Sequence, residues 1–136
     1  MTKSIKALAA AGGAVAGLFG GLDAALSVLV AFMTIDYITG LLVGWLGRSG
    51  KTETGRLDSK AGFHGLCRKG LMLLTVLMAA LLDRALGAEA AMFRDLMVWF
   101  YIANEGLSIL ENLSLAGVPF PERVRAALEQ LQSGRE

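Results

Sequence analysis

Four apolar stretches dominate the sequence, and none shows the alternation of apolar and polar side chains that marks a β-strand. The clearest stretch covers residues 24–46 and contains a single charged side chain, Asp36. A helix over these residues would be roughly 34 Å long at about 1.5 Å per residue, enough to cross a hydrocarbon core about 30 Å thick. Residues 24–46 therefore predict a transmembrane helix.

The other three stretches are less uniform. Residues 7–22 are rich in Ala and Gly and follow two lysines, a pattern also seen in signal peptides, but because another span comes directly after them we expect them to be retained and to cross the membrane. Residues 66–86 have a short apolar part, 71–82. They can cross the membrane only if the charged side chains at both ends reach the membrane surface. The alternative is a buried helix of a soluble protein. Residues 92–113 combine apolar with polar positions.

The C-terminal tail, residues 117–136, begins with a turn containing Gly117, Pro119 and Pro121 and continues as a short amphipathic helix over 122–131. We expect this helix to lie on the membrane surface or on a sister subunit. The sequence thus predicts an all-α integral membrane protein, a single domain over residues 1–136 with about four transmembrane helices and a C-terminal amphipathic helix.

Composition agrees with a membrane location. Of the 136 residues, 54% are hydrophobic and 18% are charged, against about 25% charged in an average soluble domain. A single cysteine, Cys67, excludes an intrachain disulfide framework, and with the single histidine, His64, it leaves no zinc-type cluster. Three of the 17 glycines recur four residues apart and would let one helix face approach a neighbour closely: Gly13, Gly17 and Gly21.

The positive charges predict the topology. Residues 47–70 carry six of the thirteen basic residues, which by the positive-inside rule makes this segment a cytoplasmic loop: Arg48, Lys51, Arg56, Lys60, Arg68 and Lys69. Lys3 and Lys6 place residues 1–6 on the same side, and Arg123 and Arg125 place the tail there too. Four spans with both ends cytoplasmic satisfy these charges. If residues 7–22 were interfacial or cleaved, three spans would remain and the N-terminus would lie outside.

Polar side chains follow one face of the helix predicted over residues 92–113. At membrane depth such a face must be hidden in a bundle or line water. It could be an internal seam, with Glu105 bonded to Asn104 or Arg84, or a surface for oligomer contact and pore lining, and Asp36 presents the same choice. The face consists of Arg94, Tyr101, Asn104, Glu105, Ser108, Glu111 and Asn112.

Nothing in the sequence predicts an enzyme. The serines lack the GxSxG pattern of a nucleophile elbow, and the GxxxxGK[ST] spacing of a phosphate-binding loop is absent. His64 is more typical of a solvated residue than of a general base, and Cys67 of an inert thiol at the membrane interface. The basic loop lacks the interleaved aromatic residues of a nucleic-acid interface. We therefore expect no catalytic site, metal, cofactor or nucleic-acid partner.

Several blocks resemble the toxin-secretion/phage-lysis holin family over roughly residues 28–132. The most specific block is residues 101–112, TyrIleAlaAsnGluGlyLeuSerIleLeuGluAsn. The others, in order, are AspTyrIleThrGly at 36–40, SerLysAlaGlyPheHisGly at 59–65, ArgLys at 68–69, Asp83, and GlyValPro at 117–119.

The resemblance implies a homo-oligomer of the bacterial cytoplasmic membrane that opens pores or lesions, through which an endolysin reaches the cell wall or a large toxin leaves the cell. It implies neither catalysis nor a cofactor. Carried over by position, it makes Asp36, Asn104, Glu105, Ser108, Glu111 and Asn112 candidates for oligomer contact or pore lining, and Lys60 and Lys69 topology determinants. The alternatives are a small ion or proton channel or transporter subunit, with Asp36 and Glu105 as a charge pathway, and a membrane scaffold that only binds partners.

Overall fold

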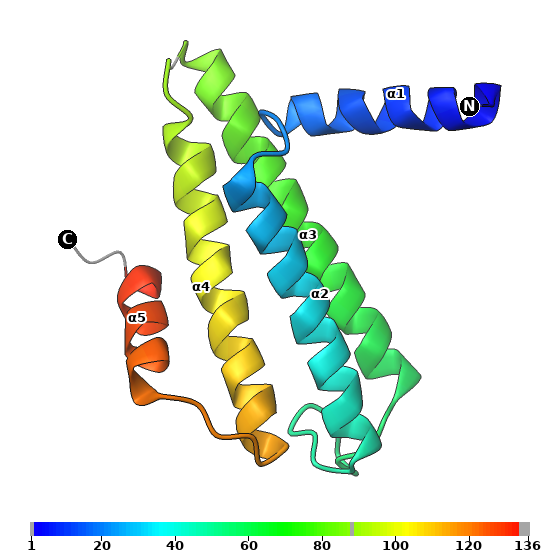
Figure 1. The fold of residues 1–136 in the computed structure, drawn as a ribbon, viewed down its shortest axis with the longest axis vertical. Coiled ribbons are helices and arrows are strands. Elements are labelled where there is room, and N and C mark those ends of the chain that lie inside the picture. The colour runs from blue at the N-terminus through cyan, green and yellow to red at the C-terminus, as the bar shows by residue number, and fades with distance from the viewer. Residues whose placement is uncertain (1, 88, 134–136) are drawn as a thin grey trace.

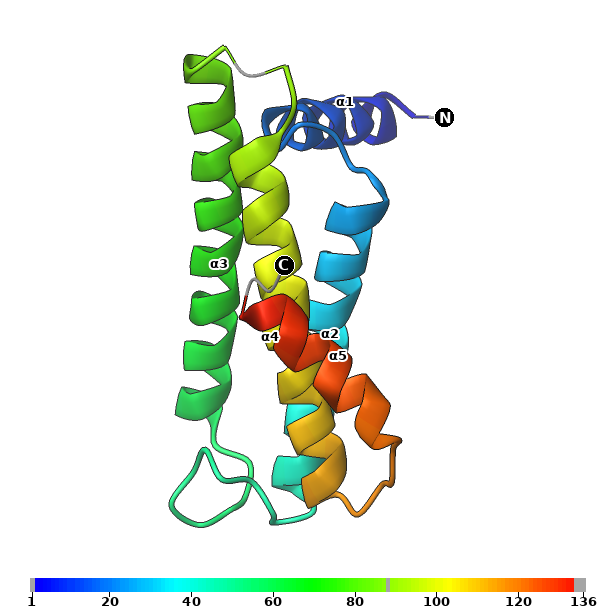
Figure 2. The same ribbon diagram turned by 90° about the vertical axis from the view of Figure 1, so that its left-hand side faces the viewer.

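The computed structural model describes residues 2–87 and 89–133, and all of its regular structure is helical. Three long helices, α2 (Ala24–Trp45), α3 (Ser59–Ala85) and α4 (Met92–Leu115), run side by side in alternating directions (Figure 1). Helix α1 (Lys3–Leu18) projects sideways from one end of this bundle (Figure 1), and α5 (Glu122–Gln132) folds back over α4 (Figure 2). The all-α prediction is confirmed.

Local sequence signals set the ends of these helices. The Asp23 carboxylate accepts a hydrogen bond from the Leu26 amide at 2.9 Å and starts α2, and Gly47, with φ +75°, follows its end. Asp58 accepts from the Lys60 amide at 3.2 Å and starts α3 at Ser59. The helix expected from residue 66 therefore begins earlier, because an aspartate cap precedes a segment that contains no proline.

This early start corrects the predicted basic loop. Lys60, Arg68 and Lys69 lie on α3, and only Arg48, Lys51 and Arg56 lie in the connection between α2 and α3. The positive charges still gather at one end of the bundle, because the first turns of α3 adjoin that connection (Figure 1).

The hydrophobic core lies between the three long helices in one half of the bundle. It consists of Leu26, Leu29, Met33, Met72, Val76, Val98 and Ile102. Most of the remaining apolar surface faces outward: only 28% of the most apolar window of α2 and 22% of that of α3 is buried. A soluble protein could not leave so much apolar surface in water, whereas lipid covers it at no cost.

Helices α2 and α3 are the two, among the described residues, that are long and apolar enough to cross a membrane. The structure thus supports two spans directly and does not show the four that the sequence predicts. Helix α1 has 16 residues and no buried side chain, and it ends at Leu18, four residues before the predicted span does. No neighbour within the described chain lies within 4 Å of where a Cβ would stand on Gly13, Gly17 or Gly21. The close packing expected of these glycines therefore has no partner inside this part of the chain.

Helix α5 packs on its own chain, in contrast to the expectation that it would lie on the membrane surface or on a sister subunit. Gly106 makes this possible, because a Cβ there would come within 2.9 Å of the Leu128 methyl carbons. The Gln132 amide donates to Asn104 Oδ1 at 3.1 Å and holds the end of α5 against the middle of α4.

Candidate functional site

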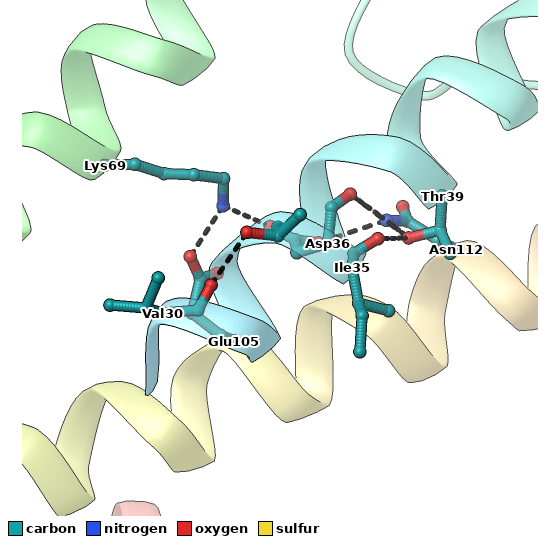
Figure 3. Close-up of polar contacts among 8 residues, drawn as sticks. Val30, Ile35, Asp36, Thr39, Lys69, Glu105 and Asn112 are labelled. Carbon is teal, nitrogen blue, oxygen red and sulfur yellow. Dashed lines mark hydrogen bonds and ion pairs between the residues drawn. The ribbon is translucent and has the colours of Figure 1, made fainter. Parts of the chain in front are cut away.

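A charged triad joins the three long helices. Lys69 Nζ lies 2.6 Å from Asp36 Oδ2 and 2.6 Å from Glu105 Oε1 (Figure 3). Asp36 and Glu105 expose only 5% and 3% of their surfaces, and the Lys69 side chain exposes 16%. One residue of α2, one of α3 and one of α4 therefore meet at a buried point.

The helical repeat explains why these residues face inward. Asp36 follows the core residues Leu29 and Met33 by seven and three positions, and so lies on the same face of α2. Lys69 precedes Met72 and Val76 on α3 by three and seven positions, and Glu105 follows Val98 and Ile102 on α4 by the same intervals. The triad is the next layer of the core, built from charged side chains.

A second set of hydrogen bonds extends the triad from α4 to α2. Asn112 Nδ2 donates to Asp36 Oδ1 at 3.1 Å, to the Asp36 backbone oxygen at 3.2 Å and to Thr39 Oγ1 at 2.9 Å (Figure 3). Every buried side-chain nitrogen and oxygen in the described residues has a hydrogen-bond partner. This arrangement avoids the cost of leaving polar groups unpaired away from water.

A cavity of about 730 Å³, lined by both polar and apolar side chains, leads to the triad. We call it the vestibule. It lies among α2, α3, α4, α5 and the α2–α3 connection, and Asp36, Lys69 and Glu105 lie at its inner end. Its other charged or polar lining includes Ser49, Lys51, Arg56, Arg68, Asn104, Ser108, Glu111, Arg125 and Glu129.

The hydrophobic core closes the vestibule beyond the triad. Because α3 runs opposite to both α2 and α4, core residues that precede Asp36 on α2, follow Lys69 on α3 and precede Glu105 on α4 all lie toward the α1 end of the bundle. The basic half of the bundle therefore contains a cavity, its middle holds the charged triad, and its other half is filled by the hydrophobic core.

Arg94 organises the opposite end of the bundle. Its side chain is 2% exposed, and its guanidinium donates to the backbone oxygens of Phe19 at 2.6 Å and Gly21 at 2.9 Å and to the Asp23 carboxylate at 2.8 Å. The Asp83 carboxylate accepts from the Phe93 and Arg94 amides and caps α4. These bonds fasten the α1–α2 turn to α4, and the bonded guanidinium lowers the pKa of Asp23.

The structure divides the predicted polar face of α4. Glu105 and Asn112 are bonded inside the bundle, Asn104 contacts α5, Ser108 and Glu111 line the vestibule, and Tyr101 packs against the core. Of the two seam partners considered for Glu105, neither is found: Lys69 takes that place, and Arg84 donates to the Gly17 backbone oxygen. Sequence reasoning missed the structural role of Lys69, although its spacing from Met72 and Val76 was the signal that could have found it.

Comparison with known proteins identifies the family. The model of the bacteriophage holin family matches residues 13–133. This chain belongs to the bacteriophage holin family. The family consists of non-enzymatic membrane proteins, so the chain is a membrane protein and not an enzyme.

Related proteins match over most of their length. An uncharacterized 14.9 kDa protein of Clostridium perfringens is 42% identical over 116 residues, 85% of this chain and 83% of the relative. An uncharacterized protein of Listeria monocytogenes is 43% identical over 112 residues, 81% of this chain and 74% of the relative. A probable holin of Bacillus phage phi105 is 33% identical over 111 residues, 82% of this chain and 76% of the relative. No solved structure is significantly similar.

Proposed function

We propose that this holin family member assembles with copies of itself in the bacterial cytoplasmic membrane and opens pores or lesions, which release an endolysin during host lysis or a large toxin. The observation that carries this proposal is the charged triad at the end of the vestibule. The outer surface of α2 and α3 is apolar, yet charged side chains meet inside the bundle, half-way along α2. Such side chains can line water when the helices separate and several copies assemble.

The proposed membrane placement has three spans. Helices α2 and α3 cross the bilayer by length and hydropathy, and α4 crosses between them because its polar face is bonded to both. The basic end of the bundle lies in the cytoplasm, together with the C-terminal tail. Helix α1 projects sideways from the opposite end (Figure 1) and exposes Leu8 and Val15, as a helix lying along the outer membrane interface would. The N-terminus then lies outside, as the three-span alternative from the sequence requires.

Opening requires a rearrangement. In a single chain the triad ties α3 to α2 and α4, and the hydrophobic core closes the path beyond it. Residues proposed to line the pore fall into two groups. Five already border the vestibule in the closed form, namely Asn104, Ser108, Glu111 and, paired with Lys69, Asp36 and Glu105, whereas Asn112 becomes available only when its contacts with α2 break.

Release from vesicles tests the proposal. Vesicles loaded with both a small dye and a folded protein of tens of kilodaltons are incubated with the purified full chain. We expect release of the dye and of the folded protein, with a steep dependence on protein concentration because several copies must assemble. Release of the dye alone, or sealed vesicles at every concentration, contradicts the proposal.

A small ion or proton channel, or a transporter subunit, is the second candidate. The vestibule favours it, because it gives access from one end of the bundle to two carboxylates, Asp36 and Glu105. A selective, saturable ion current without release of folded protein identifies this function. Vesicles that stay sealed to ions and proteins identify a scaffold.

A further inference from the structure

A second, smaller hollow borders the first turns of α3 and shares five of its lining residues with the vestibule. Its volume is about 350 Å³, and we call it the basic hollow. Lys60, His64 and Arg68 recur every four residues on α3 and so share one helix face, and Lys51 approaches from the α2–α3 connection. The hollow is lined by Lys51, Asp58, Lys60, Ala61, His64, Gly65 and Arg68.

The basic hollow carries an excess of positive charge. Lys51, Lys60 and Arg68 face a single carboxylate, Asp58. Within residues 2–87 and 89–133, none of these three cations forms an ion pair. Lys69, which directly follows Arg68 on α3, forms two. The Asp58 carboxylate already accepts a hydrogen bond from the Lys60 amide. The hollow therefore attracts an anion from outside the chain.

The position of the hollow along α3 indicates which anion it meets. Helix α3 has 27 residues and is roughly 40 Å long at about 1.5 Å per residue, about 10 Å more than the hydrocarbon core. Its apolar part, residues 71–82, lies toward the C-terminal end, so the first turns extend into the headgroup layer. Phe63 does not line the hollow, but it exposes 65% of its surface and follows Lys60 by three positions on α3, so it provides an apolar side chain on a neighbouring part of the helix surface. A ligand with a charged head and an apolar body matches this combination.

We propose that the basic hollow binds the phosphodiester headgroup of an anionic phospholipid, with Lys60 and Arg68 as the main contacts and Lys51 and His64 closing the site. This inference rests on the proposed membrane placement of α3. It adds a lipid ligand to the proposed function, and the bound lipid tethers the basic end of α3 at the headgroup layer.

Lipid binding to the purified full chain tests the inference without any pore. Native mass spectrometry from detergent micelles counts bound phosphatidylglycerol and, separately, phosphatidylcholine with the same acyl chains. We expect wild type to retain phosphatidylglycerol in preference. The variant Lys60→Gln/Arg68→Gln should weaken this retention roughly thirtyfold, since each basic side chain near an anionic surface contributes about fivefold.

Two control variants separate a site from general charge. Lys3→Gln/Arg123→Gln removes the same charge from outside the hollow and should retain phosphatidylglycerol as wild type does. Lys60→Arg/Arg68→Lys keeps both positive charges in the hollow and should retain phosphatidylglycerol as wild type does, in contrast to Lys60→Gln/Arg68→Gln. Equal retention of the two lipids, or equal losses in the Gln variants, overturns the inference.

Soluble anions and vesicles supply the remaining comparisons. Inorganic phosphate that displaces phosphatidylglycerol at concentrations similar to those of the lipid identifies a free phosphate as the ligand and overturns the lipid assignment. Vesicles that release folded protein while the purified chain shows no lipid preference refute the basic hollow alone. Lipid preference with sealed vesicles refutes the proposed function alone.

Discussion

Lys69 joins the three long helices of the closed bundle through two ion pairs. Replacing it by Met keeps an unbranched side chain of similar length and removes the ammonium that lies 2.6 Å from both Asp36 and Glu105. Asn112 still bonds to Asp36, but it carries no charge. Two carboxylates with 5% and 3% of their surfaces exposed then face each other without a cation.

The magnitude follows from the burial of the pair. Removing one partner of a buried ion pair costs about 3–5 kcal/mol, because the charge that remains has lost both its counter-charge and its water. We expect Lys69→Met to fall in this range, measured as the free energy of unfolding in detergent micelles from loss of helical circular dichroism. Since the same contacts hold α3 to α2 and α4, the variant should also release folded protein from vesicles at lower concentrations than wild type.

The control is Lys60→Met, which removes the same kind of charge from an exposed position on the same helix. It should change the free energy of unfolding by less than about 0.5 kcal/mol, as exposed substitutions usually do. The triple variant Lys69→Met/Asp36→Asn/Glu105→Gln removes all three charges together and should recover much of the loss. Equal effects of Lys69→Met and Lys60→Met, or no recovery in the triple variant, refute the reasoning.

Four further predictions concern other contacts. Glu105→Leu should alter the release of folded protein from vesicles more than His64→Ala, and equal or reversed effects would count against the buried polar layer. Gly106→Ala should loosen α5, since its Cβ would meet Leu128 methyl carbons at 2.9 Å; protease sensitivity of residues 116–133 should rise, and Leu128→Ala should reverse that rise. The bond to Arg94 lowers the pKa of Asp23 in the folded state, so the ionised Asp23 carboxylate should stabilise the fold fully above pH 3.8, its ordinary pKa. This stabilisation should disappear as the pH falls through the lowered pKa of the folded state. Melting temperatures of wild type and Asp23→Asn should therefore differ near neutral pH and converge in acid. With Cys67 replaced by Ser, Thr2→Cys should react with an impermeant thiol reagent added outside cells and Thr54→Cys should not; the reverse labelling would refute the three-span placement.

The amino-acid sequence by itself determined most of the helices. Residues 24–46, 92–113 and 122–131 were predicted as helices, and α2, α4 and α5 follow these bounds closely. Hydropathy and periodicity were sufficient because each of these helices is long or amphipathic and adjoins a glycine or proline turn. The start of α3 was misplaced, because the six basic residues between positions 47 and 70 were interpreted as a loop although Asp58 provides a helix cap.

The sequence also identified Asp36, Glu105 and Asn112 as polar residues that need an explanation at membrane depth. It could not determine their partners. Asp36 and Lys69 are 33 positions apart, and Lys69 and Glu105 are 36 apart, so their contacts depend on the rotation and relative height of three separate helices. Pattern analysis finds the inward face of one helix but does not align it with the face of another.

Tertiary structure alone decided the positions of α1 and α5 as well. A 16-residue Ala/Gly-rich helix can cross a membrane only if it aligns with the bundle, and Arg94 instead binds the turn that follows it through two backbone oxygens. An amphipathic helix such as α5 can bury its apolar face on lipid, on a sister subunit or on its own chain. The missing side chain of Gly106 makes room for Leu128 and selects the last of these. Local sequence determines what each helix must hide, and packing of the whole chain determines where it is hidden.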